Sequence, residues 1–190
     1  MYRESIDKEE LEELPLIQFE GNITLIESKE DYLESIDYLS KQRILGFDTE
    51  TKPAFKKGVV YEVALLQLAT EDRAFLFRLN KIGLPNGLKS ILENPAIQKI
   101  GVAIRDDIKG LQKLNNFKPG GFIELQEHVK EYGIQDFSLK KLSAIVLGYR
   151  ISKSQRVTNW EAPDLTEAQQ IYAATDAWIS HRIFESLNQQ

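Results

Sequence analysis

Cysteine, histidine and long apolar runs are rare or absent in this 190-residue chain, and each absence excludes a class of protein or site. It contains no cysteine, which excludes disulfides and thiolate metal sites. It has only two histidines, His128 and His181, too few for a histidine-rich metal site. No apolar run approaches the length of a membrane-spanning helix, and residues 1–5 lack the apolar segment of a signal peptide. We therefore expect an intracellular (cytoplasmic) protein with no membrane partner.

The composition fits a globular chain, and its charge is unevenly distributed. Hydrophobic residues make up 42% of the sequence, which suits one domain over residues 1–190 with a substantial core. The net charge is −5, but residues 1–40 hold 12 acids and 3 bases, whereas residues 41–190 hold 17 acids and 21 bases. The acidic residues 1–15 are expected to form either a short solvated helix or a partly disordered arm. The remainder of the chain is compatible with a polyanionic partner.

Hydrophobic periodicity and turn residues predict a mixed α/β architecture. Strands are expected at 22–27, 44–50, 59–70, 74–79, 97–102 and 122–125, with the third and fourth forming a hairpin. Helices are expected at 28–39, 84–92, 103–115, 138–147 and 166–187. This order predicts a mixed five- to six-stranded sheet flanked by helices, with right-handed crossovers. A ribonuclease H-like layout fits the order, although the order alone does not select it.

Two carboxylates follow directly from an apolar strand. The segment Ile44-Leu-Gly-Phe-Asp-Thr-Glu50 should be buried on both faces at its start. Because side chains alternate across a strand, Asp48 and Glu50 project to the same face. One interpretation places both acids in a solvated exit loop. The other is a metal site, since a hard divalent cation takes oxygen ligands and offsets the repulsion between the two acids.

Two helices carry further acids on their apolar faces. Asp107 shares a stripe with Ile104 and Leu111, whereas its neighbour Asp106 falls on the polar face. In the last helix Asp176 lies one turn after Tyr172, in a row with Ile179 and other apolar residues. An acid on a buried face is costly unless it is paired or bound to a metal. A core tyrosine satisfied by backbone groups is the simpler interpretation of Tyr172 alone, but a neighbouring inward aspartate weakens it.

Taken together, these motifs resemble a family. The matching segments are Gly46-Phe-Asp-Thr-Glu50, Val63-Ala-Leu-Leu-Gln-Leu68, Gly101-Val-Ala-Ile-Arg-Asp-Asp107, Thr158-Asn-Trp-Glu161 and Tyr172-Ala-Ala-Thr-Asp176. The chain resembles a DEDD-type 3′–5′ exonuclease of the tyrosine subclass, in the group of the Werner-syndrome-type exonuclease domain and ribonuclease D. The histidine subclass requires a histidine where this chain has Ile171. Werner-type domains carry a tryptophan where this chain has Lys109, so their DNA contacts are not carried over.

The resemblance implies a mechanism with two Mg²⁺ or Mn²⁺ ions. Asp48 would bridge the ions, Glu50 and Asp176 would bind the ion that activates water, and Asp107 would hold the second ion. Tyr172 would orient the attacking water, and the product would be a nucleoside 5′-monophosphate from a 3′ end. Outside the motifs, Lys153 and Arg156 are candidates for binding backbone phosphates, although a solvated loop is an equal alternative.

Phe55 is a candidate for stacking on a terminal base, with packing as its alternative. Trp160 is expected to pack the 149–164 loop onto the domain. DNA with a 3′ end is the favoured substrate. Trimming of RNA 3′ ends and a non-catalytic nucleic-acid-binding module of the same fold stay open as alternatives.

Overall fold

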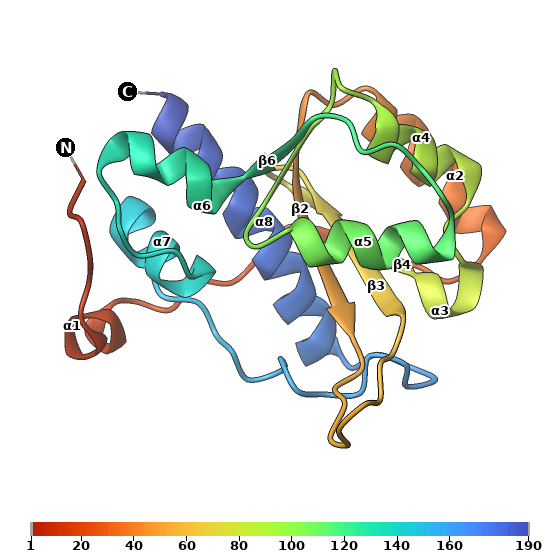
Figure 1. Cartoon of the computed structure of the whole chain (residues 1–190), viewed down its shortest axis with the longest axis horizontal. Helices are drawn as coiled ribbons and strands as arrows, with labels where there is room; N and C mark the ends of the chain where they lie inside the picture. Colours follow the sequence, from red (N-terminus) through yellow and green to blue (C-terminus); the bar gives the residue numbers. More distant parts are fainter. Residues whose placement is uncertain (1, 190) are drawn as a thin grey trace.

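A six-stranded mixed sheet forms the centre of the computed structural model, which describes residues 2–189 apart from the side chain of Lys29 (Figure 1). The strand order is β1-β4-β3-β2-β5-β6. The antiparallel strand β3 separates two parallel groups, β1 with β4 and β2 with β5 and β6. The strands are β1 Asn22–Ile26, β2 Ile44–Thr51, β3 Val63–Ala69, β4 Arg73–Arg78, β5 Gln98–Gly101 and β6 Phe122–Glu124. The predicted mixed sheet with its β3–β4 hairpin is confirmed.

Helices cover both faces of this sheet (Figure 1). They are α1 Lys8–Glu13, α2 Lys29–Ser40, α3 Leu79–Ile82, α4 Asn86–Glu93, α5 Arg105–Leu114, α6 Leu125–His128, the 3₁₀ helix η1 Val129–Tyr132, α7 Leu139–Leu147 and α8 Glu167–Asn188. The predicted helices are all present. The short α3, α6 and η1 were not predicted, because four residues are too few to show helical periodicity. No helix within residues 2–189 combines the length and apolar character needed to cross a bilayer.

Strand β3 begins later than the β-rich pattern suggested. The expected start was residue 59, but pairing begins at Val63. Phe55 and Val60 are exposed in the preceding loop, at 85% and 80% of their surface. Since no strand lies beside residues 52–62, their β propensity has no partner to pair with.

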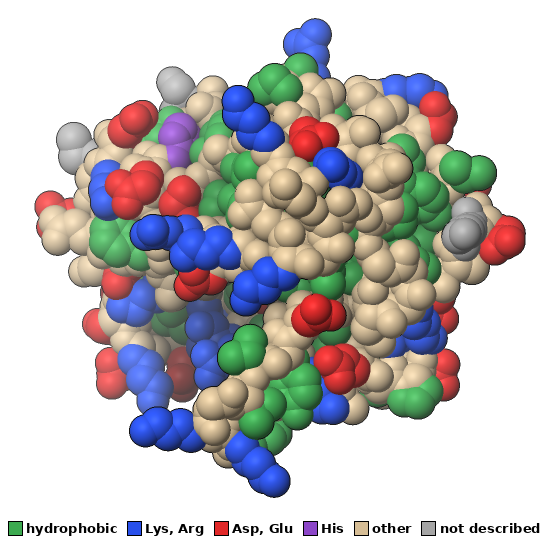
Figure 2. Space-filling view, turned by 45° about the vertical axis from the view of Figure 1, so that its right-hand side comes forward, with side chains coloured by type: hydrophobic (Ala, Val, Ile, Leu, Met, Phe, Trp, Pro, Cys, Tyr) green, Lys and Arg blue, Asp and Glu red, His purple; other side chains and the backbone are tan. Residues whose placement is uncertain are grey.

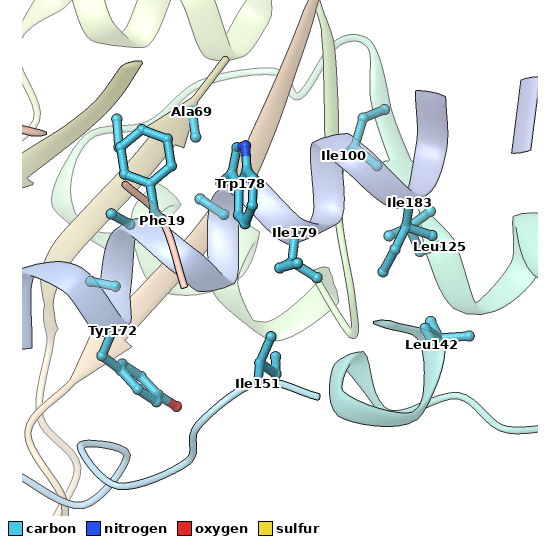
Figure 3. Close-up of a cluster of buried hydrophobic side chains, with 14 of the residues drawn as sticks. Phe19, Ala69, Ile100, Leu125, Leu142, Ile151, Tyr172, Trp178, Ile179 and Ile183 are labelled. Atoms are coloured by element: carbon cyan, nitrogen blue, oxygen red, sulfur yellow. The ribbon is translucent and has the colours of Figure 1, made fainter. Parts of the chain in front are cut away.

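Two apolar clusters fill the space between the sheet and its helices. Helices α7 and α8 pack on one face around Ile100, Leu142 and Ile179, part of which Figure 3 shows. Helices α2, α4 and α5 cover the other face around Phe47 and Leu66. The layers on the two sides therefore bury every residue of β3 and half of the residues of β2.

Helix α8 lies exceptionally close to β2, and Gly46 makes this possible. A Cβ atom at Gly46 would lie 1.8 Å from the carbonyl oxygen of Ala177, so any side chain there would push the helix away. The helix begins with a capping box between Thr166 and Gln169. The close approach places Asp48, two residues after Gly46, near Asp176, which directly precedes Ala177.

The N-terminal residues pack onto the body of the molecule. Of the two alternatives predicted for this segment, the helix is present as α1, and it buries Leu11 instead of remaining fully solvated. The backbone of Arg150 pairs with that of Pro15 and Ile17 at 3.0 and 2.9 Å. The Phe19 amide donates to the Thr175 hydroxyl of α8 at 3.0 Å. The segment thus contacts both the start of the 149–165 loop and α8.

Candidate active site

Strand β2 brings two acids to the face that α8 covers. Gly46, Asp48 and Glu50 alternate with Phe47 and Thr49, which turn to the face covered by α5. Glu50 keeps only 9% of its surface exposed. The solvated exit loop proposed as an alternative for Asp48 and Glu50 is therefore wrong, because β2 continues to Thr51.

Helix α8 completes a compact carboxylate cluster. Asp176 is 8% exposed, and one carboxylate oxygen from each of Asp48, Glu50 and Asp176 lies within 4.8 Å of the other two. Oxygen ligands at this spacing suit a hard divalent cation. Within residues 2–189, this is the one group of acidic or histidine side chains that converges closely enough to hold a metal ion.

The electrostatics of the cluster favour protonation in the absence of a cation. Burial, and then the charges of Asp176, Glu50 and Asp107, raise the pKa of Asp48 well above its usual value. Burial, followed by Asp176 and Asp107, raises the pKa of Glu50 to about 9. Burial also raises the pKa of Asp176 to about 7, although a hydrogen bond with Tyr172 and the charge of Lys153 lower it. A bound cation would reverse these shifts by favouring the ionised carboxylates.

Tyr172 lies beside this cluster on the inner face of α8. Its ring is 8% exposed and extends from the helix toward the segment that carries Ile151 (Figure 3). Burial, then the charges of Asp176 and Glu50, raise the pKa of its phenol. Tyr172 is therefore a neutral hydroxyl at physiological pH, able to donate one hydrogen bond and accept others.

Asp107 stands apart from the three converging acids, in the first turn of α5. It is half-buried, and the Thr49 hydroxyl donates a hydrogen bond to its Oδ1 atom. Burial raises its pKa, and the Thr49 hydrogen bond lowers it. The Asp106 side chain is 91% exposed and pairs with Lys109 at 3.0 Å. The predicted contrast between an inner Asp107 and a solvated Asp106 is confirmed.

A tight turn before α5 positions Asp107. Ala103 has a φ of +58°, which is costly for a residue with a side chain. The Glu124 carboxylate of β6 accepts hydrogen bonds from the backbone N–H groups of Ala103 and Ile104, each at 2.9 Å. These two bonds hold the entry to α5 and so fix the start of the helix that carries Asp107.

Two basic residues reach the cluster from the 149–165 loop. A cleft of about 250 Å³ is lined by the β2 acids, Tyr172, Asp176, Lys153 and Arg156. The charge of Arg156 lowers the pKa of Glu50, and that of Lys153 lowers the pKa of Asp176. Figure 2 shows a hollow in the lower part of the surface with Lys and Arg side chains around it.

Phe55 and Trp160 have opposite environments. Phe55 is 85% exposed in the loop after β2 and is absent from the residues that line the cleft. A packing role for Phe55 is thus wrong, while its contact with a base stays a prediction. Trp160 is fully buried, in agreement with the expected packing of its loop.

Sequence reasoning missed several residues that hold the site in place. Thr49 gives no signal of its role in the sequence, because a β-branched residue is ordinary in a strand. Arg78 is fully buried at the end of β4, where its guanidinium donates to the carbonyl oxygens of Ala162 and Pro163 at 2.5 and 3.5 Å and pairs with Glu27 at 2.8 Å. It thereby fastens the 149–165 loop to the sheet. A strand ending in arginine gave no signal of this contact.

A mixed sheet that carries an acidic cluster consistent with a divalent metal site defines a class of domain, and comparison with known proteins identifies the family. A family model described as 3′–5′ exonuclease matches residues 23–190. The chain belongs to the DEDD 3′–5′ exonuclease domains, in the group that includes WRN, ribonuclease D and mut-7. Its mixed sheet has the ribonuclease H-like arrangement of these domains.

One relative supports this family, and two solved structures support the fold. The chain is 36% identical to the bifunctional 3′–5′ exonuclease/ATP-dependent helicase WRN of Mus musculus over 193 residues, covering 96% of this chain and 14% of that protein. It therefore spans only a small part of this relative. The Nibbler EXO domain of Aedes aegypti superimposes with a TM-score of 0.81 at 24% identity, over 91% of each chain. Escherichia coli RNase D gives a TM-score of 0.76 at 21% identity, over 88% of this chain and 46% of that one.

Proposed function

We propose that this protein removes nucleotides one at a time from DNA 3′ ends, using two divalent cations, and releases nucleoside 5′-monophosphates. The observation that carries the proposal is the convergence of Asp48, Glu50 and Asp176 within 4.8 Å. Three partly or fully buried carboxylates at this distance repel one another when ionised, and a cation is the simplest group that offsets the repulsion.

The donor set fits Mg²⁺ or Mn²⁺. All four acids offer oxygen, and the chain has no cysteine to favour a softer metal. Asp48 would bridge the two ions, Glu50 and Asp176 would complete the first site, and Asp107 would serve the second. When bound, the ions supply a nucleophilic water at neutral pH and stabilise charge on the phosphoryl and leaving oxygens.

Tyr172 would position the attacking water. Its raised pKa keeps the phenol neutral, so it acts by hydrogen bonding and not as a phenolate base. Its place beside Asp176, at the wall of the cleft, suits this role. We therefore assign Asp48, Glu50, Asp107, Tyr172 and Asp176 as the catalytic residues.

The basic loop and Phe55 would bind the substrate. Lys153 and Arg156 line the cleft that holds the acids, where phosphates of the strand would pass. Phe55 lies outside the cleft on the loop after β2, and its exposed ring offers a face on which a base can stack.

RNA is the second candidate substrate. Trypanosoma brucei RNase D, solved in complex with RNA U12, superimposes with a TM-score of 0.78 at 18% identity, over 90% of this chain and 64% of that one. Since both polymers present the same phosphodiester to the acids, the site chemistry does not separate them. The choice depends on contacts with the sugar.

A matched degradation assay tests the proposal. DNA and RNA of one sequence, labelled at the 5′ end and offered with single-stranded or recessed 3′ ends, are incubated with Mg²⁺, Mn²⁺ or excess EDTA. We expect metal-dependent shortening from the 3′ end, with DNA degraded faster. Asp48→Ala, Glu50→Ala and Asp176→Ala should each abolish it. Undiminished activity in EDTA would refute the metal mechanism. Faster degradation of RNA than of DNA would identify RNA as the preferred substrate.

A further inference from the structure

Gln67, in the middle of β3, has an unusual environment. Its side chain is completely buried, yet neither its Nε2 nor its Oε1 atom has a hydrogen-bond partner among residues 2–189. A buried amide without partners destabilises a fold, and apolar side chains would fill the same space without this cost. The position therefore calls for an explanation other than packing.

The sheet register places Gln67 directly across from Asp48. The two residues are Cα partners in the antiparallel pairing of β2 with β3. Opposite residues in such a pair share one face of the sheet, with Cβ atoms about 4.5–5.5 Å apart. On the same face Leu65 lies opposite Glu50, and the partner of Gln67 on β4 is the apolar Leu76, so Asp48 is the polar cross-strand neighbour of Gln67.

Two hydroxyl groups of α8, the helix that covers this face, already have partners. The Ser180 hydroxyl donates to the Asp176 carbonyl oxygen at 3.1 Å, and the Thr175 hydroxyl donates to the Ile171 carbonyl oxygen at 2.6 Å. Burial and three neighbouring acids raise the pKa of Asp48, and a hydrogen bond from the backbone N–H of Thr49 lowers it. Asp48 thus has spare acceptor positions, and Gln67 has two unused donor hydrogens.

We propose that Gln67 is a positioning residue for Asp48: its amide N–H donates to the Asp48 carboxylate when that carboxylate is ionised around a cation. The inference rests on the proposed metal site. An amide suits the task because it donates a hydrogen bond without adding positive charge, which would compete with the cation. Partners of this kind orient ligating carboxylates, and their loss costs about 10–100-fold in metal affinity.

Binding of Mn²⁺ to the protein in the absence of nucleic acid tests the inference directly. Gln67→Met keeps an unbranched side chain of similar length but removes both polar atoms. We expect the half-saturating MnCl₂ concentration, measured by calorimetry and by the rise in melting temperature, to increase by about 10–100-fold. The melting temperature in EDTA should stay equal or rise, because an unpaired buried amide has been replaced by an apolar group.

Leu65→Met is the matched control. Leu65 lies on the same strand and face, two residues away and opposite Glu50, so this change perturbs packing without removing a donor. It should leave the half-saturating MnCl₂ concentration unchanged. If Gln67→Met does not fold, Gln67→Leu is measured against the same expectation.

The outcomes are separable from the test of the proposed function. If the unmodified protein binds MnCl₂ and Gln67→Met binds it equally well, Gln67 is a packing residue and the inference is wrong. If the unmodified protein shows no MnCl₂-dependent rise in melting temperature, the metal site itself is refuted, and the inference fails with it.

Discussion

The Thr49 hydroxyl donates a hydrogen bond to Asp107, which connects the far face of β2 to the start of α5. Thr49 lies between Asp48 and Glu50 in sequence but turns to the opposite face of the strand. One strand thus places two acids directly on one side and orients a third acid from the other side. The Asp-Thr-Glu segment thus supplies two acids of the site, donates a hydrogen bond to Asp107 and lies within 4.8 Å of the Asp176 carboxylate.

Replacing Thr49 by valine should weaken this arrangement selectively. Thr49→Val keeps the shape and β propensity but removes the donor to Asp107. We expect kcat to fall by about tenfold, as for other residues that orient a metal ligand. Thr24→Val on the edge strand β1 is the control and should leave kcat unchanged. Equal kcat for Thr49→Val and the unmodified protein would show that Asp107 needs no such support.

The two adjacent aspartates should behave differently. Asp107→Asn removes one charge from the mutual repulsion around Asp48 and Glu50, so it should raise the melting temperature in EDTA, shrink the rise caused by Mg²⁺ or Mn²⁺ and abolish activity. Asp106→Asn removes only the exposed pair with Lys109 and should leave activity and metal response unchanged. Loss of activity in Asp106→Asn, with Asp107→Asn active, would reverse our assignment of the third acid.

The stability of the metal-free protein should decrease as pH rises. Folding raises the pKa of Asp176 to about 7 and that of Glu50 to about 9, so the folded state holds more protons than the unfolded state above about pH 4. The stabilisation is complete below the unfolded pKa values and is lost as pH rises through the folded values. Between about pH 5 and about pH 9 the melting temperature in EDTA should fall, by about 2–4 °C per kcal/mol lost.

Two comparisons test whether the acidic cluster causes this slope of melting temperature against pH. Saturating Mg²⁺ should flatten it, because the cation favours the ionised carboxylates throughout the range. Asp176→Asn should flatten it in EDTA, since one of the titrating groups is removed. A melting temperature that rises with pH in EDTA would contradict the raised pKa values of the cluster.

Tyr172→Phe should separate chemistry from binding. The change preserves the ring that packs beside Trp160 and removes only the hydroxyl. We expect kcat to fall by about 10²-fold, with little change in the dissociation constant for nucleic acid measured in Ca²⁺. Tyr38→Phe, which removes a hydroxyl remote from the site, should keep full activity. An unchanged kcat would show that Tyr172 has only a packing role.

Removing both cleft-lining bases should weaken binding of every sequence alike. For Lys153→Ala combined with Arg156→Ala, the slope of log affinity against log salt should decrease by up to about 0.9 per lost duplex contact. Lys41→Ala combined with Lys118→Ala makes the same change in net charge at exposed positions outside the cleft. The control should bind with the original slope. If the two double variants behave identically, the 149–165 loop does not contact the substrate.

The acids of the proposed site stand out in the sequence because they violate a pattern. Asp48 and Glu50 extend an apolar strand, and Asp107 and Asp176 interrupt apolar helical faces. The mixed sheet followed from strand order and turn residues. Both inferences use only neighbours along the chain, within one element or two adjacent elements.

The residues that support the site could not be found in this way. Lys99 looks like the polar member of an alternating strand, but it is fully buried, and its ammonium donates to the carbonyl oxygens of Ile91, Asn94 and Ile97. Arg78 is buried because carbonyl groups of a loop far along the chain surround it. Such environments depend on how distant segments pack, which no local pattern encodes.

The pairing of Pro15 and Ile17 with Arg150 has a consequence for where the functional unit begins. Residues matched by the family start at 23, whereas this two-sided backbone pairing and the Phe19–Thr175 bond lie before that point. Arg150 stands three residues before Lys153, so residues that precede the segment matched by the family model provide the first anchor of the basic 149–165 loop. A protein shortened to the family boundary would retain every acid of the site and lose one of the two supports of its basic loop.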